Sequence, residues 1–378
     1  MRELRNPFRV AEHVRDAYFT DRADEVAVVR RAIADRARLL VTGPRRMGKS
    51  TVIGVAAERV EVAGGTVLQA DLATASSLTE VSNRLLRAVA AVELWRDRLS
   101  EWARGLAPVV TLGYDLSGLP RLSVALESRP RGEEGERELL EGVLDRVEEV
   151  ASESSSPVVV VLDEFQRIAE LGGEAAEWLL RRRMQENRTT GYVCAGSKGS
   201  LIAEMLQPKR AFYKFFDRLD LGPIDADHLA HWIDSRLTGA GVEAAGVGRE
   251  LVERVGPRTQ DIVQAARVLW FRCAQEGVAG PGSVEGAIGE IVTQDDPALR
   301  RTFDDLTPLQ QRILRAVAAG AEQLHSTDTR ELYGLGAASS VATGLEALVR
   351  RSILGRTGAG VRFDNPYFRE WAKRELVV

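Results

Sequence analysis

An α/β fold built on a parallel sheet is predicted by three features of this 378-residue chain. Two aliphatic runs, at 39–41 and 158–162, are apolar enough to form strands that are buried on both faces. Amphipathic helical segments separate these runs from three further strand-like segments, which is the alternation typical of layered α/β proteins. From residue 225 onward the pattern becomes helical, so we expect the sheet to end there.

A phosphate-binding loop follows the first aliphatic run, in the stretch RLLVTGPRRMGKST (38–51). The spacing is G-x-x-x-x-G-K-[ST], known as the P-loop or Walker A motif. Its glycines let successive N–H groups converge on phosphates, its lysine reaches the β- and γ-phosphates, and Ser50 is placed to bind Mg²⁺. We expect the nucleotide to contact the whole loop: Gly43, Pro44, Arg45, Arg46, Met47, Gly48, Lys49, Ser50 and Thr51. Because the basic residues of this chain are nearly all arginine, a lysine at the motif position is informative.

The segments around this loop are predicted from their periodicity. An irregular arm over residues 1–24 carries Phe8, Tyr18 and Phe19, which either contribute to an adenine pocket or close the edge of the core. The expected elements that follow are helices over about 24–36, 49–62 and 78–89, a strand over 66–73, and a helix over about 136–151. Between the last two helices, residues 94–135 are predicted to be an insertion with two short strands around a Gly/Pro turn and a solvated charge run.

Two carboxylates end the second aliphatic run, PVVVVLDEFQ (157–166). Ligands of open α/β sheets bind at the carboxyl ends of the strands, and downstream of a P-loop this is the Walker B position. Asp163 is expected to hold Mg²⁺ together with Ser50, and Glu164 is expected to orient and deprotonate the attacking water.

The next strand, GYVCAGS (191–197), ends in Ser197. Its hydroxyl either senses the γ-phosphate between the two Walker motifs or caps the following helix, and both roles are compatible. The stretch PKRAFYKFFDR (208–218) is basic and aromatic, which leaves a trans-acting arginine, a nucleic-acid contact or a packed turn open. A fifth strand is expected over 218–224.

Three parts are therefore predicted: a P-loop ATPase core (1–224), a helical lid (225–295) and a C-terminal domain (296–378). Arg258 follows Gly256-Pro257 at a helix start and either reaches the nucleotide from the lid or is solvated. The last part reads as three helices and a hairpin, with Thr307-Pro308 as a helix start, which is a winged-helix pattern.

Composition excludes several classes of protein. The net charge of −4 argues against a protein that coats nucleic acid, although a local basic patch stays open. Two cysteines and four histidines without ligand spacing argue against a disulfide framework or a zinc site. The N-terminus has no apolar core typical of a signal peptide, and no run is long enough to span a membrane, so we expect a cytoplasmic protein.

The chain resembles the archaeal-type ATPases of the AAA+/STAND group, which also occur in bacteria. The resemblance covers residues 8–376 and rests on FTDRADE, GPRRMGKST, VVVVLDEFQ, CAGSKGSLI and GPRTQD, and on the tail that ends in DNPYFREW. It implies ATP–Mg²⁺ binding, the three-part layout and nucleotide-dependent switching or assembly. It also implies that Ser197 is a sensor residue and that Arg258 is the lid arginine, although here Arg258 directly follows Gly-Pro where relatives carry a longer segment.

We therefore expect an ATP–Mg²⁺-binding, slowly hydrolysing ATPase that switches its binding to a protein partner or its self-assembly. The alternative is an ATP-gated DNA-binding protein that resembles replication initiators. A metabolic kinase is disfavoured because the sequence contains no recognisable pocket for an acceptor substrate. The winged helix is close to neutral, with Arg350 and Arg351 only at the end of its third helix, which favours protein docking over sequence-specific DNA reading.

Overall fold

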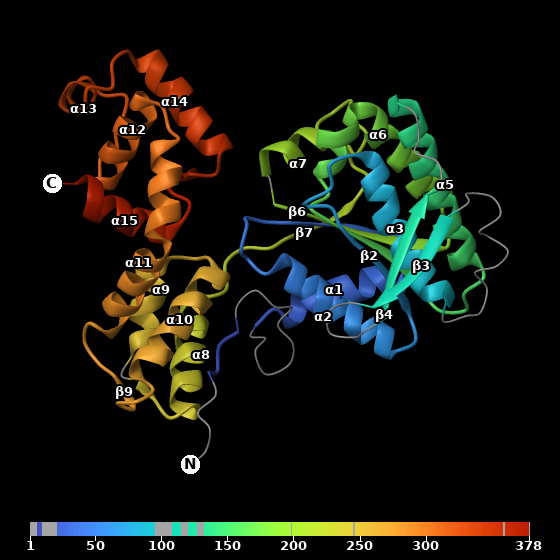
Figure 1. Cartoon of the computed structure of the whole chain (residues 1–378), viewed down its shortest axis with the longest axis horizontal. Helices are drawn as coiled ribbons and strands as arrows, with labels where there is room; N and C mark the ends of the chain where they lie inside the picture. The colour runs from blue at the N-terminus through green and yellow to red at the C-terminus, as the bar shows by residue number, and fades with distance from the viewer. Residues whose placement is uncertain are drawn as a thin grey trace. The chain divides into compact units, whose positions relative to one another are not determined.

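The computed structural model describes residues 6–9, 21–94, 108–114, 120–126, 132–197, 199–244, 246–357 and 360–377. The chain divides into two compact units, one formed by His13–Pro223 and the other by Met1–Glu12 together with Ile224–Val378. Figure 1 shows both units coloured along the chain, and each is described by itself.

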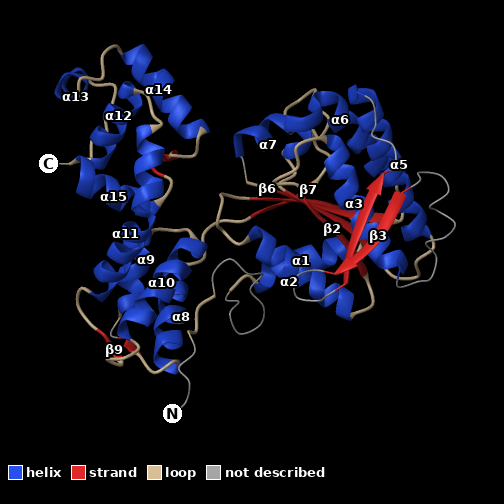
Figure 2. Cartoon of the chain, in the orientation of Figure 1, coloured by secondary structure: helices blue, strands red, loops and turns tan. Residues whose placement is uncertain are grey.

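The first unit contains a five-stranded sheet in which every pairing is parallel. The strand order is β2-β5-β6-β1-β7, and Figure 2 shows the strands in red with helices in blue around them. Its members are β1 (Arg38–Thr42), β2 (Thr66–Asp71), β5 (Val158–Asp163), β6 (Thr190–Gly196) and β7 (Asp217–Asp220). The predicted parallel α/β fold is confirmed, and strand β6 lies between the two strands that end in the Walker motifs.

Helices cover both faces of this sheet (Figure 1). One face packs on α1 (Ala23–Ala34) and α2 (Lys49–Val62); the other packs on α3 (Leu78–Leu94), α5 (Gly132–Ser152), α6 (Arg167–Glu186) and α7 (Gly199–Met205). Strand β5 shows why its sequence is aliphatic throughout: Val159 and Val161 join the α1–α2 core, and Val158, Val160 and Leu162 join the other core.

The predicted insertion forms an antiparallel hairpin of β3 (Pro108–Tyr114) and β4 (Pro120–Leu126), separate from the main sheet. Helix α5 begins at Gly132, earlier than the predicted start at about 136, so the predicted charge run forms its exposed first turn. Glu133 and Glu134 occupy the first turn of that helix, where acidic side chains interact favourably with the positive end of the helix dipole.

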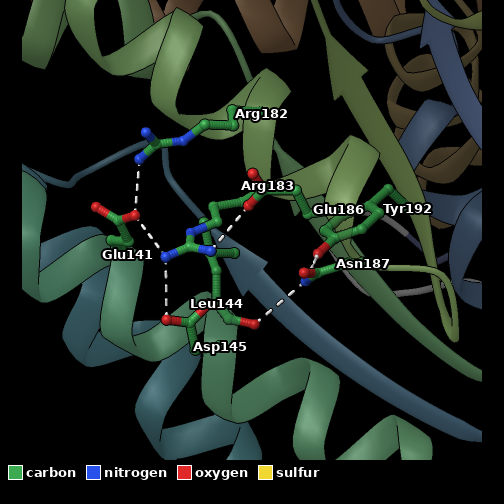
Figure 3. Close-up of polar contacts among 8 residues, drawn as sticks. All are labelled: Glu141, Leu144, Asp145, Arg182, Arg183, Glu186, Asn187 and Tyr192. Carbon is green, nitrogen blue, oxygen red and sulfur yellow. Dashed lines mark hydrogen bonds and ion pairs between the residues drawn. The ribbon is translucent and has the colours of Figure 1, made fainter.

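A polar network joins α5 to α6 at the edge opposite the Walker motifs (Figure 3). The guanidinium of Arg183 contacts Glu141, Asp145 (3.1 Å) and Glu186 (2.8 Å). Asn187, at the end of α6, donates to the Leu144 carbonyl (3.2 Å) and to the Tyr192 hydroxyl (2.8 Å). These contacts fix the start of β6 against α5.

Glu148 adds further hydrogen bonds at the same edge of the sheet. One of its oxygens accepts from the Arg188 and Thr189 amides (2.9 Å each) and from the Thr189 hydroxyl (2.8 Å), and the other accepts from the Thr190 hydroxyl (2.7 Å). Burial by itself raises the pKa of Glu148, but the hydrogen bonds from Thr190, Thr189 and Arg188 outweigh it and lower the pKa. The ionised carboxylate therefore stabilises the turn into β6.

The second unit is helical. It contains α8 (Ala226–Gly239), α9 (Val247–Val255), α10 (Thr259–Cys273) and α11 (Ser283–Asp304), and two short paired strands, β8 (Glu243–Ala244) and β9 (Val278–Ala279), which the sequence did not predict. Phe8 belongs to this core, with its ring 5.6 Å from that of Trp232, so it closes a core edge. Tyr18 and Phe19 lie outside the described residues. Helix α11 runs without interruption through Pro297 and through the expected lid boundary at 295.

The C-terminal part of this unit has the predicted winged-helix elements. They are α12 (Pro308–Ala318), α13 (Thr327–Leu332), α14 (Ala338–Arg350), the antiparallel pair β10 (Leu354–Thr357) and β11 (Gly360–Phe363), and α15 (Pro366–Leu376). Thr307 and Gln310 form a capping box at the start of α12, as the Thr-Pro pair indicated. Within the described part of the chain, no helix is sufficiently long and apolar to cross a membrane.

Candidate active site

The loop between β1 and α2 has the backbone that a phosphate site requires. Gly43, Arg46 and Gly48 all have positive φ values, of 150°, 66° and 88°, and Gly48 is the N-cap of α2. A side chain at Gly43 would bring its Cβ to 2.5 Å from the Leu221 carbonyl oxygen, so only glycine fits there. The loop therefore winds tightly and ends at the positive end of α2, which suits an anion.

Lys49, the first residue of α2, is buried, with 6% of its surface exposed. Its Nζ donates to the Gly43 and Pro44 carbonyl oxygens, at 2.9 Å each. Burial lowers the pKa of Lys49, whereas Glu164 and Asp163 oppose that shift. The ammonium is thus held inside the loop by its own backbone, at the place where phosphate oxygens are expected.

The two Walker motifs meet through Ser50 and Asp163. The Ser50 hydroxyl donates to Oδ2 of Asp163 at 2.6 Å, and Oδ1 accepts from the Glu164 amide at 2.8 Å. Burial raises the pKa of Asp163, and the two hydrogen bonds counteract it. A hydroxyl and a carboxylate at this separation fit Mg²⁺, which prefers oxygen ligands and takes most of the others from phosphates and water. No group of three or more His, Cys, Asp or Glu side chains suited to a metal occurs among the described residues.

Glu164 lies at the end of β5 with a φ of 54°, which is uncommon for a residue other than glycine. Its carboxylate accepts from the Ser197 hydroxyl, which lies 3.0 Å from each oxygen, and from Nε2 of Gln166. The Ser197 hydroxyl in turn accepts from Nε of Arg45 at 3.4 Å. A continuous chain of polar contacts therefore runs from the P-loop through Ser197 to Glu164.

Sequence reasoning did not identify Gln166. This side chain is fully buried, but in the sequence it lies between Phe165 and Arg167, two residues after Glu164, where nothing indicates its burial. A Cβ at Gly196 would come within 2.8 Å of Oε1 of Gln166, so the end of β6 packs directly on this amide. Gln166 and Ser197 together hold both oxygens of Glu164.

The other flank of the P-loop contacts the end of β7. The Leu221 amide donates to the Thr42 carbonyl (2.7 Å), and the Thr42 hydroxyl donates to Asp220. Arg22, in the N-terminal box of the resemblance, is buried and donates to the Gly222 carbonyl (2.5 Å) and to Glu25 (2.7 Å). This flank fixes residues 220–222 against the first residues of the loop.

The first unit thus brings together the Walker residues and Ser197. Arg258 belongs to the second unit, where it is the N-cap residue of α10. Its guanidinium contacts Asp364 and lies 3.9 Å from Oδ2 of Asp261, so it is engaged in ion pairs of the second unit and is not simply solvated. A role of Arg258 at the nucleotide stays a prediction.

Two family models match the chain. Residues 18–192 match the AAA ATPase domain, and residues 297–374 match a probable winged helix domain. No curated protein gives a match to the chain.

Three of the solved structures that resemble the whole chain come from archaea. A Walker-type ATPase of Pyrococcus abyssi is 17% identical, with 95% of this chain and 97% of that chain covered at a TM-score of 0.64. The ORC2 protein of Aeropyrum pernix, in ADPNP–ADP complexes, is 14% identical, with 94% of each chain covered at a TM-score of 0.60. The ORC1 protein of Aeropyrum pernix, in complex with DNA, is 15% identical, with 94% and 93% covered at a TM-score of 0.53. At these identities the likeness establishes the fold.

Proposed function

We propose that this chain, which matches the AAA ATPase domain over residues 18–192 and a probable winged helix domain over residues 297–374, is an archaeal-type AAA+ ATPase that hydrolyses ATP slowly and acts as a nucleotide switch. The ATP and ADP states would differ in affinity for a protein partner or for further copies of the chain. One observation carries the proposal: the polar chain from Arg45 through Ser197 to Glu164, beside the Ser50–Asp163 pair.

Each of these residues has a separate task. Bound ATP–Mg²⁺ supplies the γ-phosphoryl group and a cation that neutralises its charge. Lys49 and the start of α2 bind phosphate oxygens, and Ser50 and Asp163 supply oxygen ligands to the cation. Glu164 orients a water molecule and accepts its proton.

The surroundings of Glu164 support slow turnover. Ser197 and Gln166 donate to its carboxylate, so a water molecule has to share those oxygens or displace a donor. Ser197 also contacts Arg45 of the P-loop, so an oxygen of the γ-phosphate that attracts Arg45 or Ser197 changes how Glu164 is held. This coupling provides the difference between ATP and ADP that a switch requires.

Two substitutions test the assignment. Lys49→Ala removes a charge that binds phosphate in the ground state, so we expect it to lose most of the nucleotide affinity. Glu164→Gln keeps the shape of the side chain, so affinity should stay within about threefold while turnover falls roughly 10²- to 10⁴-fold. Equilibrium binding of a fluorescent ATP analogue and phosphate release measure the two effects. Glu138→Gln, an exposed substitution on α5, is the control. Turnover by Glu164→Gln at the wild-type rate would show that another group activates water.

The alternative function, ATP-gated binding of duplex DNA, has its own supporting observation. The winged helix exposes Ser339, Ser340 and Thr343 along α14, Arg350 and Arg351 at its end, and Arg356 and Arg362 in the wing. Acidic residues offset these cations: Asp304, Asp305, Asp328, Glu331, Glu346, Asp364, Glu370 and Glu375. Because phosphate neutralisation supplies most of the affinity for DNA, this balance favours a protein partner. Sub-micromolar binding of labelled duplex by the full chain, with a steep salt dependence that Arg350→Ala/Arg351→Ala abolishes, would establish the alternative instead.

A further inference from the structure

The turn between α7 and β7 (residues 206–216) is held rigidly on α6. Arg210 contacts the fully buried Glu177 and pairs with Glu204 at 2.8 Å. Phe212 packs edge-on against Phe165, with ring centroids 5.1 Å apart, and Phe215 and Phe216 complete this aromatic cluster. Of the three interpretations that the sequence left open for residues 208–218, the packed turn is therefore present. The other side chains of the turn do not contribute to this packing.

The exposed side chains of the turn include Lys209, Tyr213 and Lys214. Tyr213 keeps 41% of its surface exposed, and the Nζ of Lys214 lies 5.4 Å from the centre of its ring. Both lysines have positive φ values, of 75° and 50°. Such backbone costs free energy for any residue with a side chain, and it is held here by the anchored turn. The turn therefore presents these groups in a fixed arrangement.

Trp178 of α6 extends the surface next to the turn. It keeps 45% of its surface exposed. The guanidinium of Arg181 lies 5.5 Å from the Trp178 ring and 5.1 Å from the Phe215 ring, and it donates to the Ala211 carbonyl. We refer to Trp178, Arg181, Lys209, Tyr213 and Lys214 as the aromatic–basic patch.

The two lysines of this patch are not paired with its acidic neighbours. Glu174, Glu177 and Glu204 all pair with Arg210, which lies beneath the surface of the turn. Lys209 and Lys214 form no ion pair with any residue in the described part of the chain. The exposed groups are therefore two aromatic rings and two lysines, with the half-buried Arg181 beside them, which is the composition of a surface for stacked bases and phosphates.

The lysines help to discriminate between classes of partner. The chain has 51 basic residues but only five lysines, at positions 49, 198, 209, 214 and 373, so two of the five lie in this turn. Lysine is depleted at protein–protein interfaces, whereas it is a usual ligand of phosphate. We propose that the aromatic–basic patch binds single-stranded nucleic acid, with bases stacked on Trp178 and Tyr213 and phosphates paired with Lys209 and Lys214. This site is separate from the winged helix and does not depend on the nucleotide switch.

Fluorescence anisotropy of the full chain with a labelled oligothymidylate of about twenty nucleotides tests this inference. We expect Trp178→Ala and Tyr213→Ala each to weaken binding about 5- to 100-fold, because stacking of one base on an aromatic ring has that worth. Trp178→Phe keeps a ring and should retain most of the affinity. Lys209→Gln/Lys214→Gln should also make binding less dependent on salt.

The matched control is Phe271→Ala. Phe271 is 56% exposed and has Arg267 at 5.9 Å from its ring, so it is another exposed aromatic–arginine pair, but on α10 of the second unit. The inference is refuted if the wild-type chain fails to bind the oligonucleotide at low salt. It is equally refuted if Phe271→Ala weakens binding as much as Trp178→Ala. It is also refuted if polyglutamate, and not the oligonucleotide, binds with an affinity that the patch substitutions reduce, which would assign the patch to an acidic protein segment.

Discussion

Replacing Gly43 by alanine tests whether the P-loop depends on its contact with the end of β7. The added Cβ would lie 2.5 Å from the Leu221 carbonyl oxygen and 3.3 Å from both the carbonyl carbon and the Cβ of Leu221. Residue 221 cannot easily retreat, because its amide is bonded to the Thr42 carbonyl and the next carbonyl accepts from the buried Arg22. The backbone of Gly43 also has a φ of 150°, which residues with side chains rarely adopt.

The expected loss of stability is the sum of two contributions, the contact with Leu221 and the unfavourable φ. A backbone oxygen has to move by roughly half an ångström or more, and overpacking of this kind typically costs about 1–3 kcal/mol. The unfavourable φ adds about 1–3 kcal/mol. We therefore expect Gly43→Ala to lower the free energy of unfolding of the first unit by about 2–6 kcal/mol. Where the loop relaxes instead, the same cost appears as weaker nucleotide binding, because its amides no longer converge on the phosphates.

Gly222→Ala provides the control for this prediction. Nothing lies within 4 Å of a Cβ at Gly222, its φ is not positive, and its carbonyl still accepts from Arg22 after substitution. Urea unfolding and equilibrium binding of an ATP analogue are measured for both variants. Wild-type stability together with wild-type affinity in Gly43→Ala would refute the steric argument. An equal loss in Gly222→Ala would show that any substitution near this linker is harmful.

Three further predictions concern other parts of the chain. Ser197→Ala should reduce the ratio of ADP to ATP-analogue dissociation constants about 10- to 100-fold with little change in ADP affinity, because it removes the hydroxyl that links Arg45 to Glu164, and a hydrogen bond to a charged group is worth about 1.5–3 kcal/mol; an unchanged ratio would contradict this. Glu148 has a lowered pKa in the folded state, so its stabilisation is present above the unfolded pKa of about 4.3 and is lost as the pH falls below it. Glu148→Gln should therefore unfold more easily at pH 7, by about 1–3 kcal/mol, with the difference from wild type disappearing in acid, whereas Glu138→Gln should follow the wild-type curve. Arg258→Ala should reduce the ratio of ADP to ATP-analogue dissociation constants, and an unchanged ratio would leave Arg258 as a residue of the second unit's ion pairs alone.

The main sheet was predictable because its signals are local. Aliphatic runs buried on both faces, the P-loop spacing and the Asp-Glu pair each occupy a few consecutive residues, and each specifies a strand or its end. The contact between Ser50 and Asp163 needs no further information, since parallel strands bring their carboxyl ends to one edge. The same reasoning placed Ser197 between the two motifs.

The features that were missed depend on partners distant in sequence. Gln166 reads as a polar residue at a helix start, and only the fold reveals that its amide lies between Glu164 and the end of β6. Helix α11 runs through Pro297, which in sequence indicates a helix boundary. Its continuation depends on packing, because Ile288, Ile291 and other apolar residues on both sides of the proline join one core.

The ion pair of Arg258 shows how a single residue can link two predicted parts of the second unit. Arg258 begins α10 of the lid, and Asp364 precedes α15 of the winged helix. The Tyr367 hydroxyl donates to the Asp261 carbonyl at 2.6 Å beside this pair, so the two segments are fastened together at the point where Arg258 lies. A guanidinium that leaves this site for a phosphate gives up its contact with Asp364 and leaves two carboxylates, Asp364 and the buried Asp261, without that counter-charge. Coupling between two binding events is reciprocal. A ligand that draws Arg258 away from Asp364 therefore also weakens the contact between the winged helix and the lid. In the same way, a partner that holds the winged helix against the lid opposes the withdrawal of Arg258. The pair therefore gives the proposed switch a physical route from the lid arginine to the C-terminal domain.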